Sequence, residues 1–338
     1  MTNLFKRAAV FTDIHLGEKS NSHQFLADCE RYITWFIDLV RSEDCDMILF
    51  LGDFHHHRNS ININTMNVSL RCLERLNDLG LPVMFIPGNH DLYHKDRRTL
   101  TSVGYINKFS NFNLIMDQVT IDDVCFVPWL IGEEHKNMKR VRAKYVMGHF
   151  ELPGYMMNAM VEMPDHGGDL KADDFGNVDL VFTGHFHKRQ NKRNVHYIGN
   201  AFPHNYADAW DDARGAMILT WGEEPVYHDW DEAPRYRVVN LGRLIDEADT
   251  LLNERTYARI NIDIPISYEE ATFIKETMLS QHGCRELTLI PAKKALDMEG
   301  VAVDNAFETV DQIVINQIQT LDGDHYDKRL LMDIYNNL

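Results

Sequence analysis

The 338-residue chain is long enough to bury one large core and carry a smaller second unit, and its 44% hydrophobic and 25% charged content is ordinary for a globular protein. A net charge of −17 argues against broad, non-specific attraction to nucleic acid. The five cysteines are odd in number and lack C-x-x-C spacing, which indicates neither a disulfide framework nor a thiolate zinc site. No apolar run approaches the ~20 residues that span a bilayer, and residues 1–7 are too short and mixed for a secretion signal. We therefore expect a soluble, cytoplasmic protein without membrane contact.

The first predicted strand, residues 7–11, leads directly to Asp13 and His15. Side chains two residues apart in an extended segment point to the same side, so these two can bind one ion. Apolar residues at helical spacing over 25–40 then predict a helix that returns to the next strand as a β-α-β unit.

The second predicted strand, residues 47–51, is an unbroken apolar run followed by Gly52 and Asp53. Such a run predicts a strand covered on both faces in a parallel sheet, and reactive groups in open α/β sheets gather where strands end. Asp53 is therefore placed where chemistry is expected. The histidines at 55–57 follow at once, and a solvated loop is the alternative interpretation if they are taken alone.

Three later strands also end in residues that bind metals. After a predicted helix at 68–79, strands at 82–86, 145–149 and 179–183 lead to Asn89, His149, His185 and His187. Runs at 195–198 and 216–220 predict strands that close a second sheet, and short runs over 112–127 predict a local antiparallel excursion. The Gly-, Pro- and Met-rich segment 152–176 is expected to form a mobile rim over the site.

A change in composition near residue 233 predicts a first domain at 1–232 and a small α+β domain at 233–292. In the second, Ser267 and Glu270 fit the capping box of a helix. Residues 293–305 are predicted to be a linker, and 306–338 to be two short amphipathic helices. Such a hairpin buries little by itself, so its apolar faces need either their own domain or a partner.

Seven oxygen and nitrogen ligands follow the predicted strands: Asp13, His15, Asp53, Asn89, His149, His185 and His187. A set without thiolates suits Mn²⁺, Mg²⁺, Fe²⁺ or Zn²⁺, and seven ligands suit two ions that share a bridge. Asp53 is the natural bridge, because one carboxylate can offer an oxygen to each ion. A hydrogen-bonded core or surface role is the alternative for any single histidine, but the ordered set favours a metal centre.

The order of these motifs resembles the calcineurin-like metallophosphoesterase superfamily. Within it, residues 12–17, 88–91 and 184–187 are similar to the nuclease subunits of SbcCD-type double-strand-break repair complexes. The recombination endonuclease subunits of tailed bacteriophages also share the character of 127–129, 148–152, 197–199 and the pair Arg214-Gly215. The specific resemblance covers about residues 8–216, and the remainder matches in architecture alone.

The resemblance implies an α/β fold, a four-layer α-β-β-α metallophosphoesterase sandwich with a DNA-binding capping domain and a C-terminal helical hairpin. It also implies two divalent ions, with Mn²⁺ preferred and Mg²⁺ as the alternative. One ion would be held by Asp13, His15, Asp53 and His187, and the other by Asp53, Asn89, His149 and His185.

The resemblance further implies that His90 contacts the scissile phosphate and protonates the departing oxygen, with Asp91 orienting its ring. A second catalytic histidine would be His56. Relatives place an aromatic residue two positions after the bridging aspartate, whereas here Phe54 comes one after it. The sequence therefore leaves open which of the histidines at 55–57 reaches the substrate.

Basic residues cluster beside the metal-ligand motifs, which favours contact with a phosphate backbone over solvated loops. The DNA-binding candidates are Arg58, Lys95, Arg97, Arg98, Lys188 and Arg189.

We therefore expect a metal-dependent DNA nuclease for recombination or repair, an exonuclease on duplex ends and an endonuclease on single strands. The chain has no G-x-x-x-x-G-K-[ST] run, and the resemblance implies an ABC-type coiled-coil ATPase partner docked by 306–338, a homodimer and, for a phage protein, the host-cell cytoplasm. One alternative is a phosphodiesterase or phosphatase for small molecules or phosphoproteins. Another is a non-catalytic scaffold subunit. A scaffold would be expected to have lost some of the metal-ligand residues, and in this sequence none of the seven is missing. Cleavage polarity, strand preference, the metal used in vivo, dimer geometry and any requirement for ATP stay open.

Overall fold

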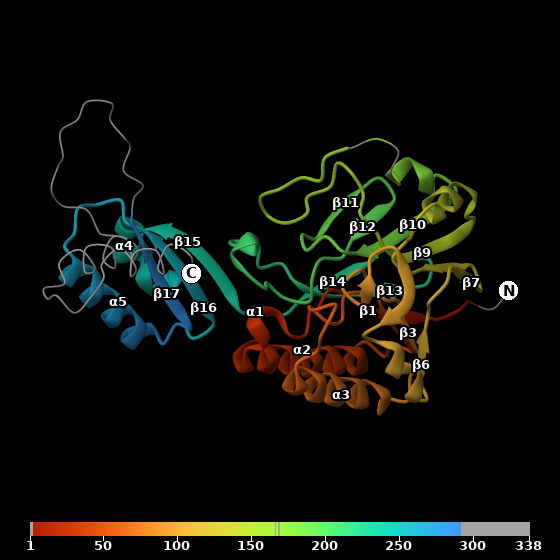
Figure 1. Ribbon diagram of the computed structural model, residues 1–338, viewed down its shortest axis with the longest axis horizontal. Helices are drawn as coiled ribbons and strands as arrows, with labels where there is room; N and C mark the ends of the chain where they lie inside the picture. The colour runs from red at the N-terminus through yellow and green to blue at the C-terminus, as the bar shows by residue number, and fades with distance from the viewer. Residues whose placement is uncertain (1–2, 166, 168–169, 292–338) are drawn as a thin grey trace, which may run out of the picture. The chain divides into compact units, whose positions relative to one another are not determined.

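The computed structural model describes residues 3–165, 167 and 170–291, so the predicted linker and C-terminal helices lie outside the described residues. The chain divides into two compact units, one of residues 1–238 with 255–257 and one of 239–254 with the residues from 258 on (Figure 1). This division falls within the strand β15 (Arg235–Asn240), whereas the boundary predicted from composition lies at 232/233.

The first sheet of the larger unit has six strands. In spatial order they are β14 (Val226–Asp229), β13 (Gly215–Thr220), β1 (Arg7–Phe11), β2 (Met47–Phe50), β3 (Val83–Phe85) and β6 (Phe112–Leu114). The strands from β1 to β6 are parallel, whereas β13 and β14 add to one edge in antiparallel pairing. The prediction that 216–220 closes the second sheet is therefore wrong. Both faces of β13 are buried, which suits a strand paired beside β1.

The second sheet also has six strands. Their order is β11 (Gln190–Lys192), β12 (Val195–Tyr197), β10 (Val178–Gly184), β9 (Ala143–His149), β8 (Val124–Val127) and β7 (Val119–Ile121). The four central strands are parallel and the two edge strands antiparallel. Only β7 and β8 form the antiparallel excursion predicted over 112–127, because β6 extends the first sheet parallel to β3.

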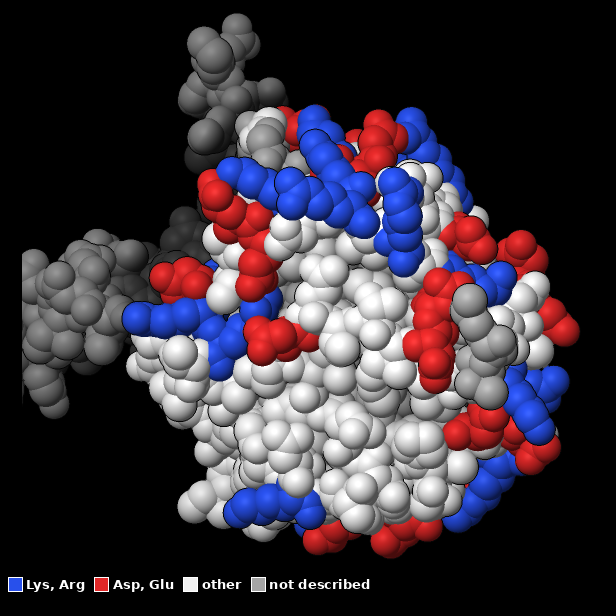
Figure 2. Space-filling view, turned by 90° about the vertical axis from the view of Figure 1, so that its right-hand side faces the viewer, with Lys and Arg blue, Asp and Glu red and all other residues white. Residues whose placement is uncertain are grey.

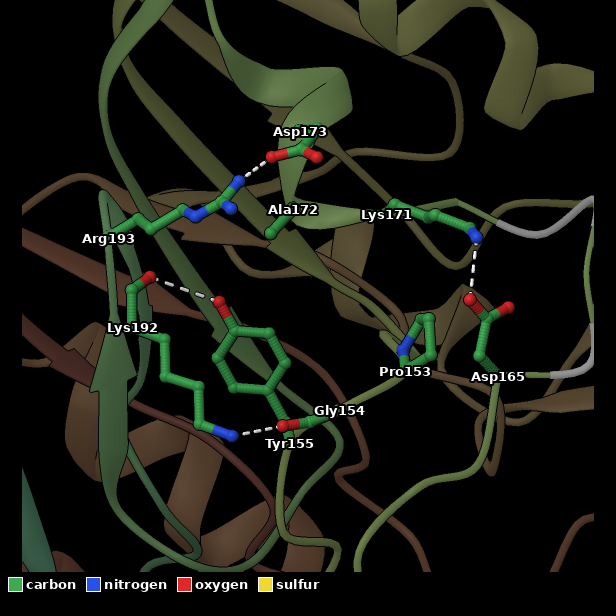
Figure 3. A pocket seen from close by; sticks show the side chains of 9 residues that line it. All are labelled: Pro153, Gly154, Tyr155, Asp165, Lys171, Ala172, Asp173, Lys192 and Arg193. Atoms are coloured by element: carbon green, nitrogen blue, oxygen red, sulfur yellow. Dashed lines mark hydrogen bonds and ion pairs between the residues drawn. The ribbon is translucent and has the colours of Figure 1, made fainter.

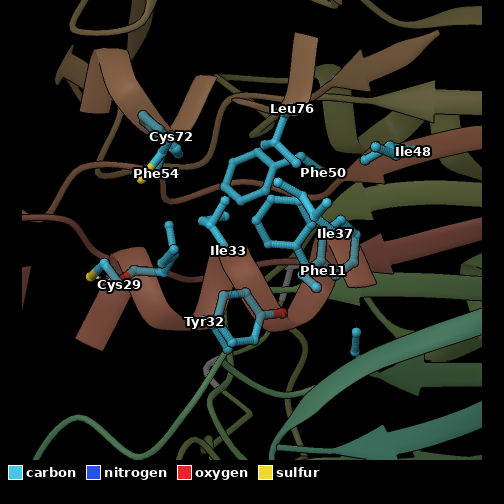
Figure 4. Close-up of a cluster of buried hydrophobic side chains, with 14 of the residues drawn as sticks. Phe11, Cys29, Tyr32, Ile33, Ile37, Ile48, Phe50, Phe54, Cys72 and Leu76 are labelled. Atoms are coloured by element: carbon cyan, nitrogen blue, oxygen red, sulfur yellow. Dashed lines mark hydrogen bonds between the residues drawn. The ribbon is translucent and has the colours of Figure 1, made fainter. Parts of the chain in front are cut away.

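Alternate residues of each strand face different cores. In β1, Val10 lies between the two sheets, while Phe11 lies under the helices α2 (His23–Ser42) and α3 (Ile63–Asn77). Figure 4 shows this helical core, where Phe11 and Phe50 of the sheet meet Ile33 of α2. Burying a side chain of this kind contributes roughly 1.5–3 kcal/mol.

The outer face of the second sheet is covered by η2 (Glu134–Arg140), η3 (Ala172–Phe175) and the segment between β9 and β10. The four-layer sandwich is therefore confirmed, with 3-10 helices and loops as its fourth layer. Leu152 and Tyr155 are buried in that layer, so the segment predicted as a rim is in part a packed element.

Local polar groups determine where the helices begin. The hydroxyl of Ser22 accepts the N–H of Phe25 at the start of α2, and Asn62 accepts the N–H of Asn64 at the start of α3. α3 therefore begins five residues before the predicted helix at 68, because the cap and not the apolar pattern sets its start. The remaining short elements of this unit are α1 (Glu18–Asn21), the hairpin of β4 (Leu92–His94) and β5 (Arg97–Thr101), η1 (Gly104–Lys108) and η4 (Tyr206–Asp208).

The smaller unit is a three-stranded sheet of β15, β16 (Thr256–Asn261) and β17 (Glu286–Ile290) with α4 (Leu241–Leu251) and α5 (Tyr268–His282). Ser267 and Glu270 form the predicted capping box at the start of α5. Among the helices in the described part of the chain, none has the length and apolarity needed to cross a membrane.

Candidate metal centre

The seven predicted ligands come together at the carboxyl ends of five parallel strands. Asp13 and His15 follow β1, Asp53 follows β2, Asn89 follows β3, His149 ends β9, and His185 and His187 follow β10. The two sheets meet here, since the backbone N–H of His185 donates to Asp13 Oδ2 at 3.0 Å and His149 Nδ1 donates to Leu51 O at 2.7 Å. The side chains form two groups.

Group A consists of Asp13, His15 and His187. His15 Nε2 lies 3.7 Å from Asp13 Oδ1 and 3.6 Å from Asp53 Oδ2. His15 is 3% exposed, and within the described residues neither of its ring nitrogens has a hydrogen-bond partner. An unsatisfied buried polar group costs about 1–3 kcal/mol, so this ring is arranged for a ligand that the protein itself does not supply. A divalent cation fits that requirement.

Group B consists of Asp53, His149 and His185, with Asn89 beside them. Asn89 Oδ1 lies 3.1 Å from His149 Nε2 and 2.9 Å from His185 Nδ1. Because His149 donates its Nδ1 proton to a backbone carbonyl, its Nε2 lone pair faces the group, as metal ligation requires.

Asp53 lies between the two groups. Its Oδ2 is 3.6 Å from His15 Nε2 in group A and 3.4 Å from His149 Nε2 in group B, and its Oδ1 accepts the N–H of His90. Although burial opposes ionisation, His149, His90 and His15 hold the pKa of Asp53 well below its ordinary value. Burial also disfavours the charged form of His149, yet Asp53 raises the pKa of His149 to about 9. A cation in group B would take the place of that proton.

Backbone strain concentrates at the same residues. Asp13, His15, Asp53 and His185 have φ values of 50°, 48°, 59° and 90°, in the region that non-glycine residues rarely occupy. The motif glycines allow this close packing, because a Cβ on Gly52 would lie 2.3 Å from His149 Nδ1 and one on Gly88 would lie 2.2 Å from Asp53 Oδ1.

His90 and His56 lie beside the two groups, within reach of His15. His90 Nδ1 donates to the backbone carbonyl of His56 at 2.6 Å, and His56 Nδ1 lies 2.7 Å from Glu18 Oε2. Burial lowers the pKa of His90 to about 4 against the attraction of Asp53, so this ring is neutral at pH 7 until an anion approaches. Although burial opposes it, the contact with His56 lowers the pKa of Glu18 to about 2.

The His55 side chain has a structural role. Its ring is 1% exposed and bonded to the hydroxyls of Ser69 and Ser102 at 2.9 and 3.1 Å. Burial lowers the pKa of His55 to about 3, which keeps the ring neutral. Of the three histidines at 55–57, His56 is the one that lies in a group with His15 and His90.

The predicted role of Asp91 needs correction. Its carboxylate does not contact the His90 ring but accepts the N–H groups of Phe54, His55 and Gly88 at 2.9–3.2 Å. Asp91 thus ties the loop after β2 to the loop after β3, and the carbonyl of His56 orients His90 in its place.

Sequence reasoning missed His204. It is fully buried, neither ring nitrogen has a partner, and its ring centroid lies 5.5 Å from that of His15 and 5.4 Å from that of His187. It follows Pro203 in a loop and not an apolar strand, so nothing in the local pattern separates it from an ordinary histidine.

Glu151 was also missed, and it lies 3.1 Å from His185 Nε2. A carboxylate on the second ring nitrogen holds a metal-binding histidine in one tautomer and orientation, and removing one typically costs about 10–100-fold in affinity. We expect Glu151→Ala to weaken Mn²⁺ binding by that factor in calorimetric titration. Glu162→Ala, which removes an exposed carboxylate from the same segment, should bind as the wild type does. Equal affinity of the two variants would remove Glu151 from the centre.

Two DNA-binding candidates are engaged inside the fold. Arg98 pairs with Glu134 and donates to the carbonyl of Trp129, and Arg189 pairs with Asp229 at 2.6 Å. Lys95 and Arg97 are exposed on the β4–β5 hairpin, Lys188 Nζ lies 3.8 Å from Asp211, and Arg58 is half-buried. The face drawn in Figure 2 carries acidic and basic side chains around a broad uncharged area, not one uniformly positive field.

The family model for calcineurin-like phosphoesterases matches residues 6–189, more than half of the chain. The chain belongs to the calcineurin-like phosphoesterase family. The resemblance inferred from the motifs is thereby confirmed, and with it the class of hydrolases that cleave phosphoesters with divalent cations.

This calcineurin-like phosphoesterase is 28% identical to "Exonuclease subunit 1" of Enterobacteria phage T4 over 216 residues, which are 61% of this chain and 62% of that protein. It is 20% identical to "Uncharacterized protein R555" of Acanthamoeba polyphaga mimivirus over 230 residues, 62% of this chain and 17% of that protein. The chain thus spans less than two thirds of either relative.

Solved structures with a similar fold include the nuclease MPE of Pseudomonas putida, at 16% identity and a TM-score of 0.32 over 65% of this chain and 87% of that one. The chain is also similar to a dimetal phosphatase of Danio rerio, at 11% identity and a TM-score of 0.42. The match covers 68% of this chain and 96% of that one.

Proposed function

We propose that this chain is a metal-dependent DNA nuclease that hydrolyses phosphodiesters with two divalent cations, Mn²⁺ or, as the alternative, Mg²⁺. The observation that supports this best is Asp53 Oδ2, placed between two groups of nitrogen and oxygen ligands, with His90 beside both. In this proposal His187 would complete the ligands of the ion in group A, and Asn89 would complete those of the ion in group B. The similarity to an exonuclease subunit of phage T4 supports DNA as the substrate.

The chemistry divides between the cations and the protein. When bound, two cations would neutralise phosphate charge and lower the pKa of a water molecule toward ~7. The protein supplies the proton donor: His90 Nδ1 donates to the carbonyl of His56, so Nε2 is the atom that takes up a proton when the phosphate anion approaches and then gives it to the departing sugar oxygen. A diester has a poor leaving group, so protonation there contributes to the rate. Glu18 holds His56 beside His90.

We assign phosphate-backbone contacts to the basic side chains that the fold leaves near the site without a buried ion pair. These are Arg58, Lys95, Arg97 and Lys188. Arg98 and Arg189 are left out, because their guanidinium groups already pair with Glu134 and Asp229.

The decisive experiment compares substrates. Purified chain with Mn²⁺ should degrade end-labelled duplex and single-stranded DNA, and EDTA should stop it. Turnover of 4-nitrophenyl phosphate, a monoester, should be much slower than turnover of the diester bis(4-nitrophenyl) phosphate. Fast hydrolysis of the monoester with intact DNA would identify a phosphatase of the same fold instead.

We further propose that the chain works as a homodimer with an ABC-type coiled-coil ATPase in recombination or repair, docked through 306–338. The name of the phage T4 relative, a subunit, supports an assembly. Ending the chain after Lys294 should abolish co-purification with that ATPase while Mn²⁺-dependent cleavage of simple substrates persists. Retained association would move the docking site elsewhere.

A further inference from the structure

The segment between β9 and β10 contains a hairpin at 154–163 that no step above uses. Gly154 and Met163 pair at its base through an N–H to O bond of 2.8 Å, and Met157 N–H donates to Val161 O at 2.7 Å near its tip. Asn158 closes the turn, since its Oδ1 accepts the N–H groups of Met160 and Val161 at 2.8 and 3.1 Å. The turn is therefore built and held by its own polar groups.

The hairpin is anchored on the neighbouring edge strand β11 and the loop before it. Gln190 bonds both polar groups of the Met156 backbone, accepting its N–H at 2.8 Å and donating to its carbonyl at 2.5 Å. Figure 3 shows the base, where Tyr155 donates to the carbonyl of Lys192 and Lys192 donates to that of Gly154. The pocket drawn there offers no unpaired cation to an anion, because Lys171 and Arg193 pair with Asp165 and Asp173.

One bond ties the hairpin to the metal centre, and a second ties it to η4. The N–H of His187 in group A donates to Met157 O at 3.0 Å, and the N–H of Ala159 donates to Ala207 O at 3.3 Å. The tip residues Met160 and Val161 are therefore three and four positions along the chain from Met157, whose carbonyl contacts the predicted ligand His187.

The tip presents two apolar side chains to solvent. Met160 is 75% exposed and Val161 is 50% exposed. Met157 and Met163 below them pack against the hydrophobic core on the outer face of the second sheet. Two side chains are far too small an area for a stable protein interface, which buries more than about 1,000 Å². A rigid apolar tip of this size is what separates stacked bases, and methionine is among the residues that do so.

We propose that Met160 and Val161 form a wedge that stacks against the terminal base pair of duplex DNA and opens it, so that one strand reaches the metal centre. The inference rests on the proposed nuclease function and adds to it the form of the substrate, a duplex end that the enzyme itself unpairs. An apolar wedge acts by unstacking a base step, so it should matter for paired ends and little for strands that are already unpaired.

The test is a double variant, Met160→Ser with Val161→Ser, and a matched control, Val226→Ser. Val226 is 55% exposed on the edge strand β14. The control therefore replaces a valine that is about as exposed as Val161 but lies outside the hairpin. Hydrolysis of bis(4-nitrophenyl) phosphate reports folding and the intact centre, and should be equal in all three proteins. Cleavage of duplex relative to single-stranded DNA should fall about tenfold in the double variant alone, because unstacking the end is then no longer assisted.

A second measurement monitors the opening of the duplex end in the absence of cleavage. A duplex with 2-aminopurine at its end and phosphorothioate linkages should brighten with wild-type protein and with Val226→Ser, but not with the double variant. If the double variant matched the wild type within about twofold in duplex preference and in fluorescence, the wedge would be overturned, since the two side chains would then contribute little to opening the end. If the wild-type protein turned over the small diester but left all DNA intact, the nuclease proposal would be overturned instead. The fluorescence signal alone would then show whether the tip opens a duplex end.

Discussion

Asp53→Asn is expected to abolish tight cation binding in both groups and to lower DNA cleavage by at least ~10³-fold, a barrier increase of about 4 kcal/mol. The substitution keeps the shape of the side chain and removes only its charge. Because Oδ2 lies 3.6 Å from His15 Nε2 and 3.4 Å from His149 Nε2, losing that charge affects both groups at once.

Calorimetric titration with Mn²⁺ gives the number of ions bound, which should fall from two per chain in the wild type to none at micromolar concentration. Asp38→Asn, a carboxylate 69% exposed on α2, is the matched control and should bind two. Loss of a single ion in Asp53→Asn would show that Asp53 serves one group and not both.

His90→Ala is expected to keep both ions and lose DNA cleavage by about 10²–10⁴-fold, the usual range for a positioned acid or base. The ring contributes no atom to either group, and its backbone N–H, which bonds Asp53 Oδ1, survives the substitution. Metal titration should therefore be unchanged.

A leaving-group comparison separates proton donation from a merely structural effect. The 4-nitrophenolate of bis(4-nitrophenyl) phosphate departs without a proton, so His90→Ala should lose far less activity on this diester than on DNA. His228→Ala, on the edge strand β14, should change neither. Equal losses on the two substrates would assign His90 to binding and not to proton transfer.

The sequence by itself predicted which side chains meet at the strand ends, and their order along the chain. Each follows a buried apolar run, and such a run is a local feature: side chains that must be covered on both faces predict a parallel strand, whose carboxyl end then presents the next polar residue. Asp53 after Leu51 and Gly52 is recognisable for that reason alone. The capping box at Ser267 is equally local and was correctly predicted.

The tertiary structure decided which residues support those ligands. Glu151 reaches His185 from 34 positions away, and Arg98 is occupied by Glu134 across 36 positions, so neither fact is visible in any short window. Asp91 lies next to His90 in sequence but accepts two backbone N–H groups from the loop after β2 and that of Gly88 in its own loop. The strand β13 was placed in the wrong sheet for the same reason: its apolar residues suit either sheet, and only the competition between strand edges assigns it to β1. Periodicity and apolar runs report whether a segment is buried, whereas its partners depend on chain segments that close over it from a distance.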